Sequence, residues 1–246
     1  MLRTFFSPKW LLVHLFFVAM VAAMVSLGFW QLRRLDERRA YNALVEARAE
    51  EPAIALADVP ADADLEDWRF RTVVAEGTYL PAPEFRLTFD SVGYDLIGLL
   101  QLEDGRVVVV DRGYASLSDP APSLPTGPVT VTGRLQLPEG NGTGQLANAT
   151  SPVLIYRLDP NALAEQVGQQ PVPFVLDRIS ATPDDAALDV VPAPDLGEGP
   201  HFGYAVQWFL FSLGAITCWV LAIAKTANDR RRGPAAAPVH EGDGSY

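Results

Sequence analysis

The side chains best suited to chemistry lie at the ends of two long apolar stretches. His201, Tyr204 and Trp208 have the spacing of one helix face at the start of the second stretch, and Trp30 and Gln31 lie near the end of the first. Polar groups at a bilayer edge turn toward a partner or ligand, because lipid cannot satisfy their hydrogen bonds. A neutral imidazole among aromatic rings suits an axial ligand of haem iron. The alternative is that His201 caps its helix and reaches toward the headgroups, and the residues alone favour neither.

Other reactive constellations are nearly absent. The three histidines are His14, His201 and His240, so the sequence between the two apolar stretches contains none. That excludes a Ser-His-Asp triad and an HExxH zinc site from the central region. The single cysteine, Cys218, excludes an internal disulfide and a CxxC site. Adjacent acids such as Asp184-Asp185 are typical of a solvated surface, so the sequence predicts a protein that is not an enzyme.

One motif in the central region has two interpretations. Asp111-Arg112-Gly113 follows the apolar run Val107–Val110. It is either a strand end with a turn glycine and an outward arginine, or a cation presented at a sheet edge. In the second case Arg112 would bind an anionic group, such as a haem propionate or a carboxylate of a partner.

Two uncharged stretches are the elements that position the candidate residues. Trp10–Leu32 has 23 residues and Gly199–Ala224 has 26, and each can cross a hydrocarbon layer of about 30 Å as a helix. Trp10 and Trp30 mark the ends of the first, as interfacial aromatic residues do. No small-residue cleavage site follows it, which favours an uncleaved anchor over a signal peptide. Gly28 and Gly203 are expected to let the two helices approach closely.

Charge separates along the chain and predicts an orientation. Residues 40–203 contain nine Arg, no Lys and 25 acids, a net charge of −16, which is unfavourable for nucleic acid and anionic lipid. Lys225 and Arg230–Arg232 follow the second stretch, whereas Ala186–Phe202, at its start, contains three acidic residues and no Lys or Arg. Both termini are therefore predicted in the cytoplasm. Arg33, Arg34, Arg38 and Arg39 oppose this orientation unless they have acidic partners in propionates, lipid phosphates or the domain's own carboxylates.

The region between the stretches has the pattern of a small β domain. Arg33–Glu51 keeps helical character and is expected to continue the first helix, and residues 58–67 are predicted as a loop. One short helix is expected over Asn161–Val167, capped by Asp159. Seven runs are predicted as strands of a twisted or barrel-like, mostly antiparallel sheet: Arg69–Leu80, Glu84–Asp90, Tyr94–Leu102, Arg106–Tyr114, Val129–Leu137, Val153–Leu158 and Val172–Ile179.

These pieces together resemble the surfeit locus family of cytochrome c oxidase assembly proteins. The resemblance rests on their order and spacing over most of the chain: Gly28-Phe29-Trp30-Gln31, Gly77-Thr78-Tyr79, Asp104-Gly105-Arg106, Asp111-Arg112-Gly113-Tyr114, Val131-Thr132-Gly133-Arg134-Leu135, Pro138-Glu139 and His201–Phe209. Asp111 stands where the family usually has Asn, and Tyr114 stands where Trp is usual.

The resemblance implies a non-catalytic assembly factor that holds haem a or assists its insertion at the outer membrane boundary. His201 is then the haem ligand, and the other implied cofactor-site residues are Gly28, Trp30, Gln31, Arg112, Tyr204, Gln207 and Trp208. The implied partners are the catalytic subunit of the oxidase, the machinery of haem a synthesis and the lipid bilayer. The alternative function is a membrane-tethered extracytoplasmic sensor or ligand-binding domain without haem.

The sequence thus predicts an α+β membrane protein of the bacterial plasma membrane. We expect a cytoplasmic N-terminus (1–9), a transmembrane helix (10–32), an extracytoplasmic domain (33–200), a second transmembrane helix (201–224) and a disordered cytoplasmic tail (225–246). His14 and Trp30 are about 24 Å apart along a helix axis. His14 and His201 are therefore not expected to bind one iron within a chain, and His14 is expected to face a helix partner or to snorkel.

Overall fold

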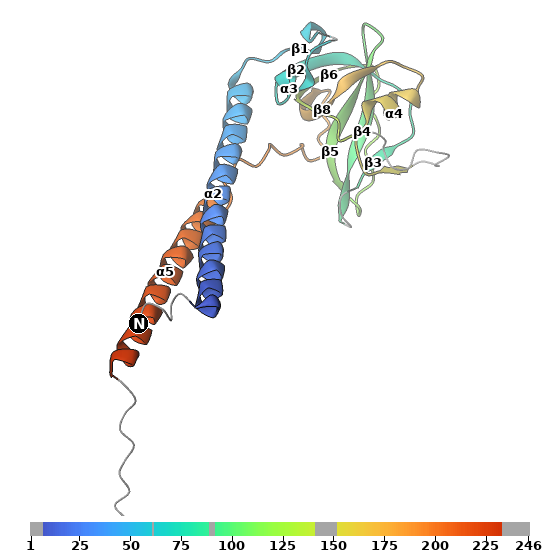
Figure 1. Cartoon of the computed structure of the whole chain (residues 1–246). Helices are drawn as coiled ribbons and strands as arrows, with labels where there is room; N and C mark the ends of the chain where they lie inside the picture. Colours follow the sequence, from blue (N-terminus) through green and yellow to red (C-terminus); the bar gives the residue numbers. More distant parts are fainter. Residues whose placement is uncertain (1–6, 61, 89–91, 141–151, 233–246) are drawn as a thin grey trace, which may run out of the picture. The chain divides into compact units, whose positions relative to one another are not determined.

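The two long helices predicted from the uncharged stretches are both present. The computed structural model describes residues 7–60, 62–88, 92–140 and 152–232. Helix α2 is Pro8–Glu50 and helix α5 is His201–Arg232 (Figure 1). The first therefore continues past Leu32 as predicted. The second continues past Ala224, so the prediction of a disordered tail is wrong for residues 225–232, whereas 233–246 lie outside the described residues.

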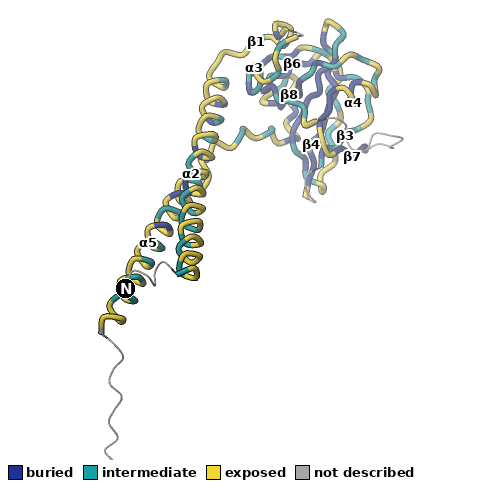
Figure 2. Tube along the Cα trace, in the orientation of Figure 1, coloured by how far each residue is buried: buried dark blue, intermediate teal, exposed yellow. Residues whose placement is uncertain are grey.

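Both helices are long and apolar enough to span a membrane, by length and composition. Only 6% of the most apolar window of each is buried within the protein, and Figure 2 shows both helices mostly in the colours of exposed and intermediate residues. A core helix of a soluble protein would be covered by its neighbours. The uncovered apolar side chains therefore indicate membrane association.

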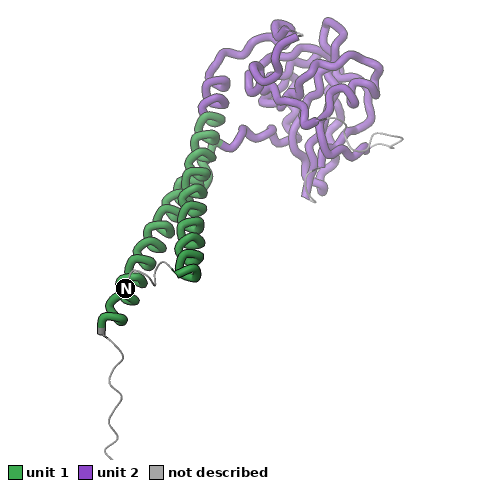
Figure 3. The backbone as a smooth tube through the Cα atoms, viewed as in Figure 1, with its two compact units in different colours: residues 1–42, 196–246 green, residues 43–195 purple. Residues whose placement is uncertain are grey.

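The chain divides into two units, which are coloured separately in Figure 3. One unit comprises residues 1–42 and 196–246 and contains the helix pair, and the other comprises residues 43–195 and contains the sheet. The predicted membrane boundaries at 32/33 and 200/201 fall in the helix-pair unit and stay predictions.

The β unit has eight described strands, and every predicted strand is among them. They are β1 (Ile54–Ala55), β2 (Thr72–Tyr79), β3 (Phe85–Leu87), β4 (Gly93–Leu102), β5 (Val107–Ser116), β6 (Pro128–Gln136), β7 (Val153–Ile155) and β8 (Pro171–Thr182). Helix α4 is Pro160–Glu165, capped by Asp159 as predicted. The predicted loop over residues 58–67 contains part of the 3₁₀ helix η1 (Leu56–Asp58) and of α3 (Leu65–Trp68), and β1 was not predicted.

Strand pairing closes the sheet into a ring. Strand β2 pairs antiparallel with β6 and with β4, while β6 pairs with β8, β8 with β5, and β5 with β4. Among the described pairings five are antiparallel, and β1–β2, β3–β7 and β5–β8 are parallel. The mixed sheet is therefore mostly antiparallel and barrel-like, which fits an α+β class.

The apolar core follows the two-residue period of the strands. Val108 and Val110 belong to an apolar cluster with residues of all the strands that close the ring (β2, β4, β5, β6 and β8). Val107 and Val109, on the other face of β5, belong to a second cluster with residues of β3, β7 and α4. All four valines are 0% exposed. The continuous apolar run in the sequence thus reflects a strand covered on both faces.

Buried arginines attach the segment after β8 to this barrel. Arg112 donates from Nε and Nη2 to the two carboxylate oxygens of Asp185 at 2.8 and 2.7 Å, and both residues are buried. Arg178, which is 2% exposed, donates to the Arg112 carbonyl and, at 3.0 Å, to the Leu188 carbonyl. Arg134 donates to Asp177 of β8 at 3.2 Å and to the Pro192 carbonyl, after β8, at 3.0 Å. These bonds satisfy charges that would be costly to bury unpaired.

The Arg112–Asp185 pair generates a stability prediction. Arg112→Ala leaves Asp185 buried without its partner, and we expect it to lower the free energy of unfolding by about 3–5 kcal/mol. The measurement is denaturant unfolding of the full chain in detergent, followed by near-UV circular dichroism. Arg106→Ala is the control, because Arg106 and Asp104 form a partly exposed pair at 2.7 Å, and we expect a loss below about 1 kcal/mol. Equal losses in the two variants would contradict this interpretation of the buried pair.

Candidate functional site

The helix pair is closely packed around Gly28. A Cβ atom at Gly28 would lie 2.7 Å from the Phe209 ring, so a larger residue there would displace that ring. On α5, Ala205 and Ser212 are buried at 1% and 4% exposure. Gly203 differs from the expectation: a Cβ atom there would meet no described atom within 4 Å. Close approach therefore depends on Gly28, and the predicted role of Gly203 is wrong.

The central contact of this unit joins His201 to Gln31. The Nδ1 atom of His201 lies 2.8 Å from Oε1 of Gln31, and both side chains are partly buried. An amide oxygen only accepts hydrogen bonds, so Nδ1 donates this bond, and in the neutral imidazole it is the nitrogen that carries the proton. The lone pair then lies on Nε2, which bonds to no side chain in the described part of the chain. Nε2 is therefore in the form that can bind a metal ion.

A short segment just before α5 is bonded to α2. Asn42 donates to the carbonyl of Leu196, and Arg38 donates to the carbonyl of Gly197 at 2.8 Å. Arg39 forms two hydrogen bonds with the carboxylate of Glu198, at 2.7 and 3.0 Å. Bonds from Arg39 hold the pKa of Glu198 below its usual range. These contacts fix where α5 begins relative to α2.

The arginine cluster that opposed the predicted orientation has partners within this unit. Besides Arg38 and Arg39, Arg34 pairs with Glu37 at 2.8 Å and lies over the ring of Trp30, 5.8 Å from its centroid. Glu198 lies within residues 33–200, the predicted extracytoplasmic domain. The domain's own carboxylates, one of the three kinds of acidic partner expected for these arginines, therefore account for part of the cluster.

The remaining predicted site residues differ in placement. Trp30 and Tyr204 are 43% and 48% exposed, so the face that carries them is not the face between the helices. Trp208 is partly buried and meets Phe211 edge-on, with ring centroids 6.1 Å apart. Gln207 is exposed. Of the residues expected to gather around His201, the structure brings Gln31 into contact with it and leaves Trp30 and Tyr204 on the outer surface of the pair.

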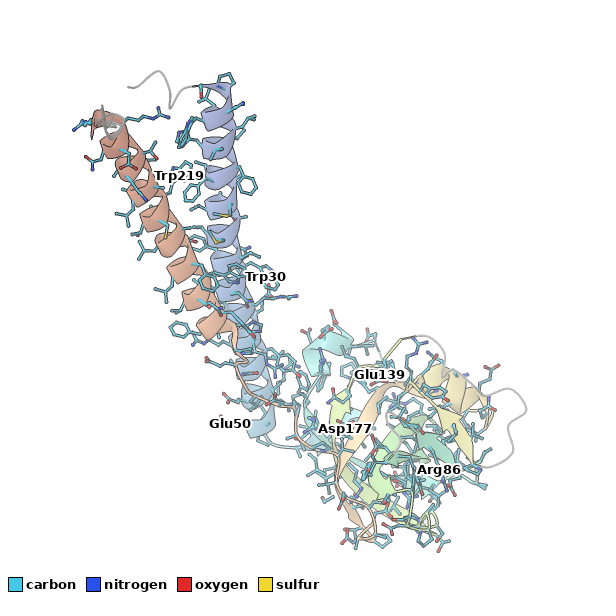
Figure 4. All side chains as sticks on the ribbon, turned by 90° about the horizontal axis from the view of Figure 1, so that it is seen from below. Trp30, Glu50, Arg86, Glu139, Asp177 and Trp219 are labelled. Carbon is cyan, nitrogen blue, oxygen red and sulfur yellow. The ribbon has the colours of Figure 1, made fainter. Side chains whose placement is uncertain are left out.

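His14 lies in a separate aromatic cluster. Its ring meets Trp219 of α5 edge-on at 5.0 Å and lies 5.7 Å from Trp10, while Phe17 stacks on Trp219 at 4.7 Å. Figure 4 shows Trp219 on α5 directed toward α2. The expectation that His14 faces a helix partner is confirmed. Since Gln31 is 17 residues further along α2, His14 and the His201 contact are about 25 Å apart along the axis.

Arg112 belongs to the β unit and is not at an open edge. It lies within β5, is 2% exposed, and has Asp185 as its carboxylate partner. Gly113 has a φ of +117°, and a Cβ atom there would overlap the carbonyl oxygen of Asp189. The motif is therefore a tight contact between β5 and the segment after β8. An outward Arg112 is wrong, and a propionate would have to displace Asp185.

Four features near His201 were missed from the sequence. Three are the bonds of Asn42, Arg38 and Arg39 to residues 196–198, and the fourth is Gly199, whose φ is +69°. A Cβ atom at Gly199 would lie 3.5 Å from Nε2 of His201. The unresolved charge conflict of the arginines, together with Glu198, was the signal that could have found the Arg39 contact.

A second candidate is an acidic cavity of about 760 Å³ in the β unit. Its lining includes Asp95, Asp111, Asp177 and Asp189, of which Asp177 is labelled in Figure 4. Burial, and then the charges of Asp95 and Asp177, raise the pKa of Asp111 well above its usual value. Burial also raises the pKa of Asp177. No group of three or more His, Cys, Asp or Glu in the described ranges is arranged to hold a metal ion.

Comparison with known proteins decides the family. The model of the SURF1 family matches residues 18–213, which include the helix pair contact and the whole β unit. The chain belongs to the SURF1 family. The resemblance to the surfeit locus family is thus confirmed, and membership suggests a role related to cytochrome oxidase assembly. Members are generally assembly factors rather than enzymes.

Relatives cover the chain to different extents. An uncharacterized SURF1-like protein of Mycobacterium tuberculosis is 28% identical over 245 residues, covering 94% of this chain and 89% of its own length. A SURF1-like protein of Monosiga brevicollis is 24% identical over 234 residues, with 87% of each chain covered. A SURF1-like protein of Rickettsia conorii is 30% identical over 99 residues, or 38% of this chain.

The buried carboxyl of Asp111 generates a pH prediction. Because the folded protein holds a proton that the unfolded chain releases above about pH 4, stability falls as pH rises toward the raised pKa of Asp111. Asp111→Asn keeps an oxygen that can accept the bond from the Gly113 amide, which lies 3.0 Å from Oδ1. We expect this variant to unfold at higher denaturant concentration than the wild type at pH 7, with a smaller difference at pH 4.

The control for this prediction is Asp119→Asn, which changes an exposed carboxyl. It should leave the denaturation midpoint unchanged at both pH values. A less stable Asp111→Asn variant at pH 7 would mean that the carboxylate is ionised in the folded protein.

Proposed function

We propose that this SURF1-family protein is a non-catalytic assembly factor for haem-copper (cytochrome c) oxidase. It holds haem a, or assists its insertion, at the outer membrane boundary, and His201 is the axial ligand. The observation that carries the proposal is the hydrogen bond between Nδ1 of His201 and Gln31. That bond leaves Nε2 available to iron and fixes the orientation of the ring.

The donor set offers one protein ligand to a haem iron. A single imidazole nitrogen offers one axial bond, and Trp30 and Tyr204 offer large, half-exposed aromatic surfaces on the same unit. Haem is a flat apolar group with two anionic propionates, so aromatic side chains and a nearby cation favour it. Arg33 is exposed and forms no ion pair with any carboxylate among the described residues, which makes it the candidate for a propionate.

The proposed surroundings follow from the charges flanking the helices. Both termini are cytoplasmic and the β unit is extracytoplasmic in the bacterial plasma membrane, with the oxidase catalytic subunit and the haem a synthesis machinery as partners. The four basic residues after Ala224, against acids alone before α5, support this orientation. Glu198 and Glu37, which pair with Arg39 and Arg34, support it further because they offset the opposing basic cluster.

The test compares the two histidines of the helix pair. His201→Ala removes the proposed ligand, so we expect the Soret band to disappear or shift and the yield of assembled oxidase to fall. His14→Ala is the matched control, since its ring packs between Trp10 and Trp219 at the other end of the pair. It should change neither reading. The proteins are purified in detergent from cells that synthesise haem a, and absorbance is normalised to protein.

Two results would contradict the proposal. If His201→Ala keeps the full Soret band and the full yield of oxidase, His201 is not the ligand. If His14→Ala is the more damaging change, either the orientation is inverted or the site forms between chains.

A further inference from the structure

One edge of strand β2 is interrupted. Along its other edge β2 pairs with β6 from Thr72 to Thr78. On this edge it pairs with β1 only at Val73 and Val74, and with β4 only from Gly77 to Tyr79. Among the described residues, no strand therefore pairs with β2 on this side between Val74 and Gly77, and Glu76 is the residue of this gap whose backbone groups face the edge. Unpaired backbone at a sheet edge can accept an extended segment of another chain.

A cavity of about 340 Å³ opens at this gap. Its lining comes from β1 and η1 (Ala55, Leu56, Ala57), from β2 (Val74, Ala75, Glu76) and from the end of β4 with the turn that follows (Leu102, Glu103, Asp104). Leu56, Ala75 and Leu102 are buried, so the floor is apolar. The cavity is near the lower end of the range for ligand pockets, about 300–1,000 Å³, and it suits one large apolar side chain.

The rim of the cavity is acidic. Glu76 and Glu103 are exposed, and neither forms an ion pair with a basic side chain in the described part of the chain. Asp104 differs, because Arg106 bonds to it at 2.7 Å through Nε and at 2.9 Å through its amide. Burial opposes the charged form of Asp104, but these bonds outweigh it and lower the pKa of Asp104. Two carboxylates therefore remain for a cationic partner.

We propose that this gap binds an extended segment of a partner protein, in which an apolar side chain enters the cavity and neighbouring Lys or Arg residues meet Glu76 and Glu103. The backbone of the segment bonds to the N–H and C=O groups of Glu76, because alternate residues of β2 face opposite edges and Ala75 faces β6. This interaction does not depend on the function proposed above, because it involves neither His201 nor haem.

Charge complementarity selects a basic segment over other occupants. A second copy of this chain would bring a region of residues 40–203 with no Lys and a net charge of −16, which repels the acidic rim. Anionic lipid is repelled for the same reason. A small apolar molecule could fill the cavity, but it would leave the backbone of β2 and both carboxylates unused.

The experiment uses the full chain in nanodiscs of neutral lipid and a set of fluorescein-labelled nonapeptides. Each peptide alternates Lys with small residues and differs only at the central position, and binding is followed by fluorescence anisotropy, with empty nanodiscs subtracted. We expect central Leu or Phe to bind about tenfold or more tightly than central Gly. Methylation of the backbone nitrogens beside the centre should weaken binding, because it removes the donor to the Glu76 carbonyl of β2.

Three variants test the surface itself. Glu76→Lys should weaken binding of the best peptide about fivefold, whereas Glu165→Lys, the same charge change at an exposed position of α4, should not. Ala57→Trp should abolish binding, because a large side chain at this exposed position would fill the cavity. Circular dichroism checks that each variant remains folded.

Several outcomes would overturn the proposal. They are no binding by any peptide, no preference at the central position, or an equal loss in Glu76→Lys and Glu165→Lys, which would mean that only net charge attracts the peptide. Binding of N-acetyl-leucine amide as tightly as the best peptide would instead assign the cavity to a small molecule. None of these readings measures haem, so they are independent of the outcome for His201.

Discussion

The arrangement of the candidate site depends on one hydrogen bond, between His201 and Gln31, whose residues are 170 positions apart in the sequence. Two features make it possible. Gly28 lets the Phe209 ring pack against α2, and the bonds of Asn42, Arg38 and Arg39 to residues 196–198 fix the start of α5. Hydrogen bonds between membrane helices contribute on average only about 0.6 kcal/mol each, so the main effect of this bond is to fix the orientation of the imidazole ring. The same bond favours the tautomer with the imidazole proton on Nδ1, and Nε2 has no side-chain partner among the described residues.

The β unit meets a different requirement, which is to bury a closed sheet and still satisfy several charges. Strand β5 is covered on both faces, and the arginines that enter the interior bond to carboxylates or carbonyls of the segment after β8. Arg112 is thereby a structural residue of the barrel. Along one edge of β2, between its pairings with β1 and β4, the surface has an apolar cavity with an acidic rim, and we propose that it binds a protein segment.

The sequence predicted the elements well because their signals are local. Uncharged length identified both long helices, short runs rich in Val, Thr, Tyr, Phe and Leu identified seven strands, and Asp159 with Pro160 identified the start of α4. The sequence did not predict the features that depend on pairing between residues far apart in the chain. The closure of the ring through β2 and β4, the two-residue strand β1 and the Arg112–Asp185 pair have no local signature. At the site, helix spacing predicted that the face of His201, Tyr204 and Trp208 meets Trp30 and Gln31. The contact of His201 with Gln31 is present, whereas Tyr204 is 48% exposed.

The most direct test of the central claim is the resonance Raman spectrum of the haem-loaded ferrous protein, prepared with natural and with ¹⁵N-labelled histidine. If Nε2 of His201 binds the iron while Nδ1 bonds to Gln31, an iron–histidine stretching band will be present and will shift with the label. The band will also shift in Gln31→Leu, which removes the acceptor of the Nδ1 proton. It will be absent in His201→Ala. A band that survives His201→Ala, or the absence of any label-sensitive band in the wild type, would contradict the account.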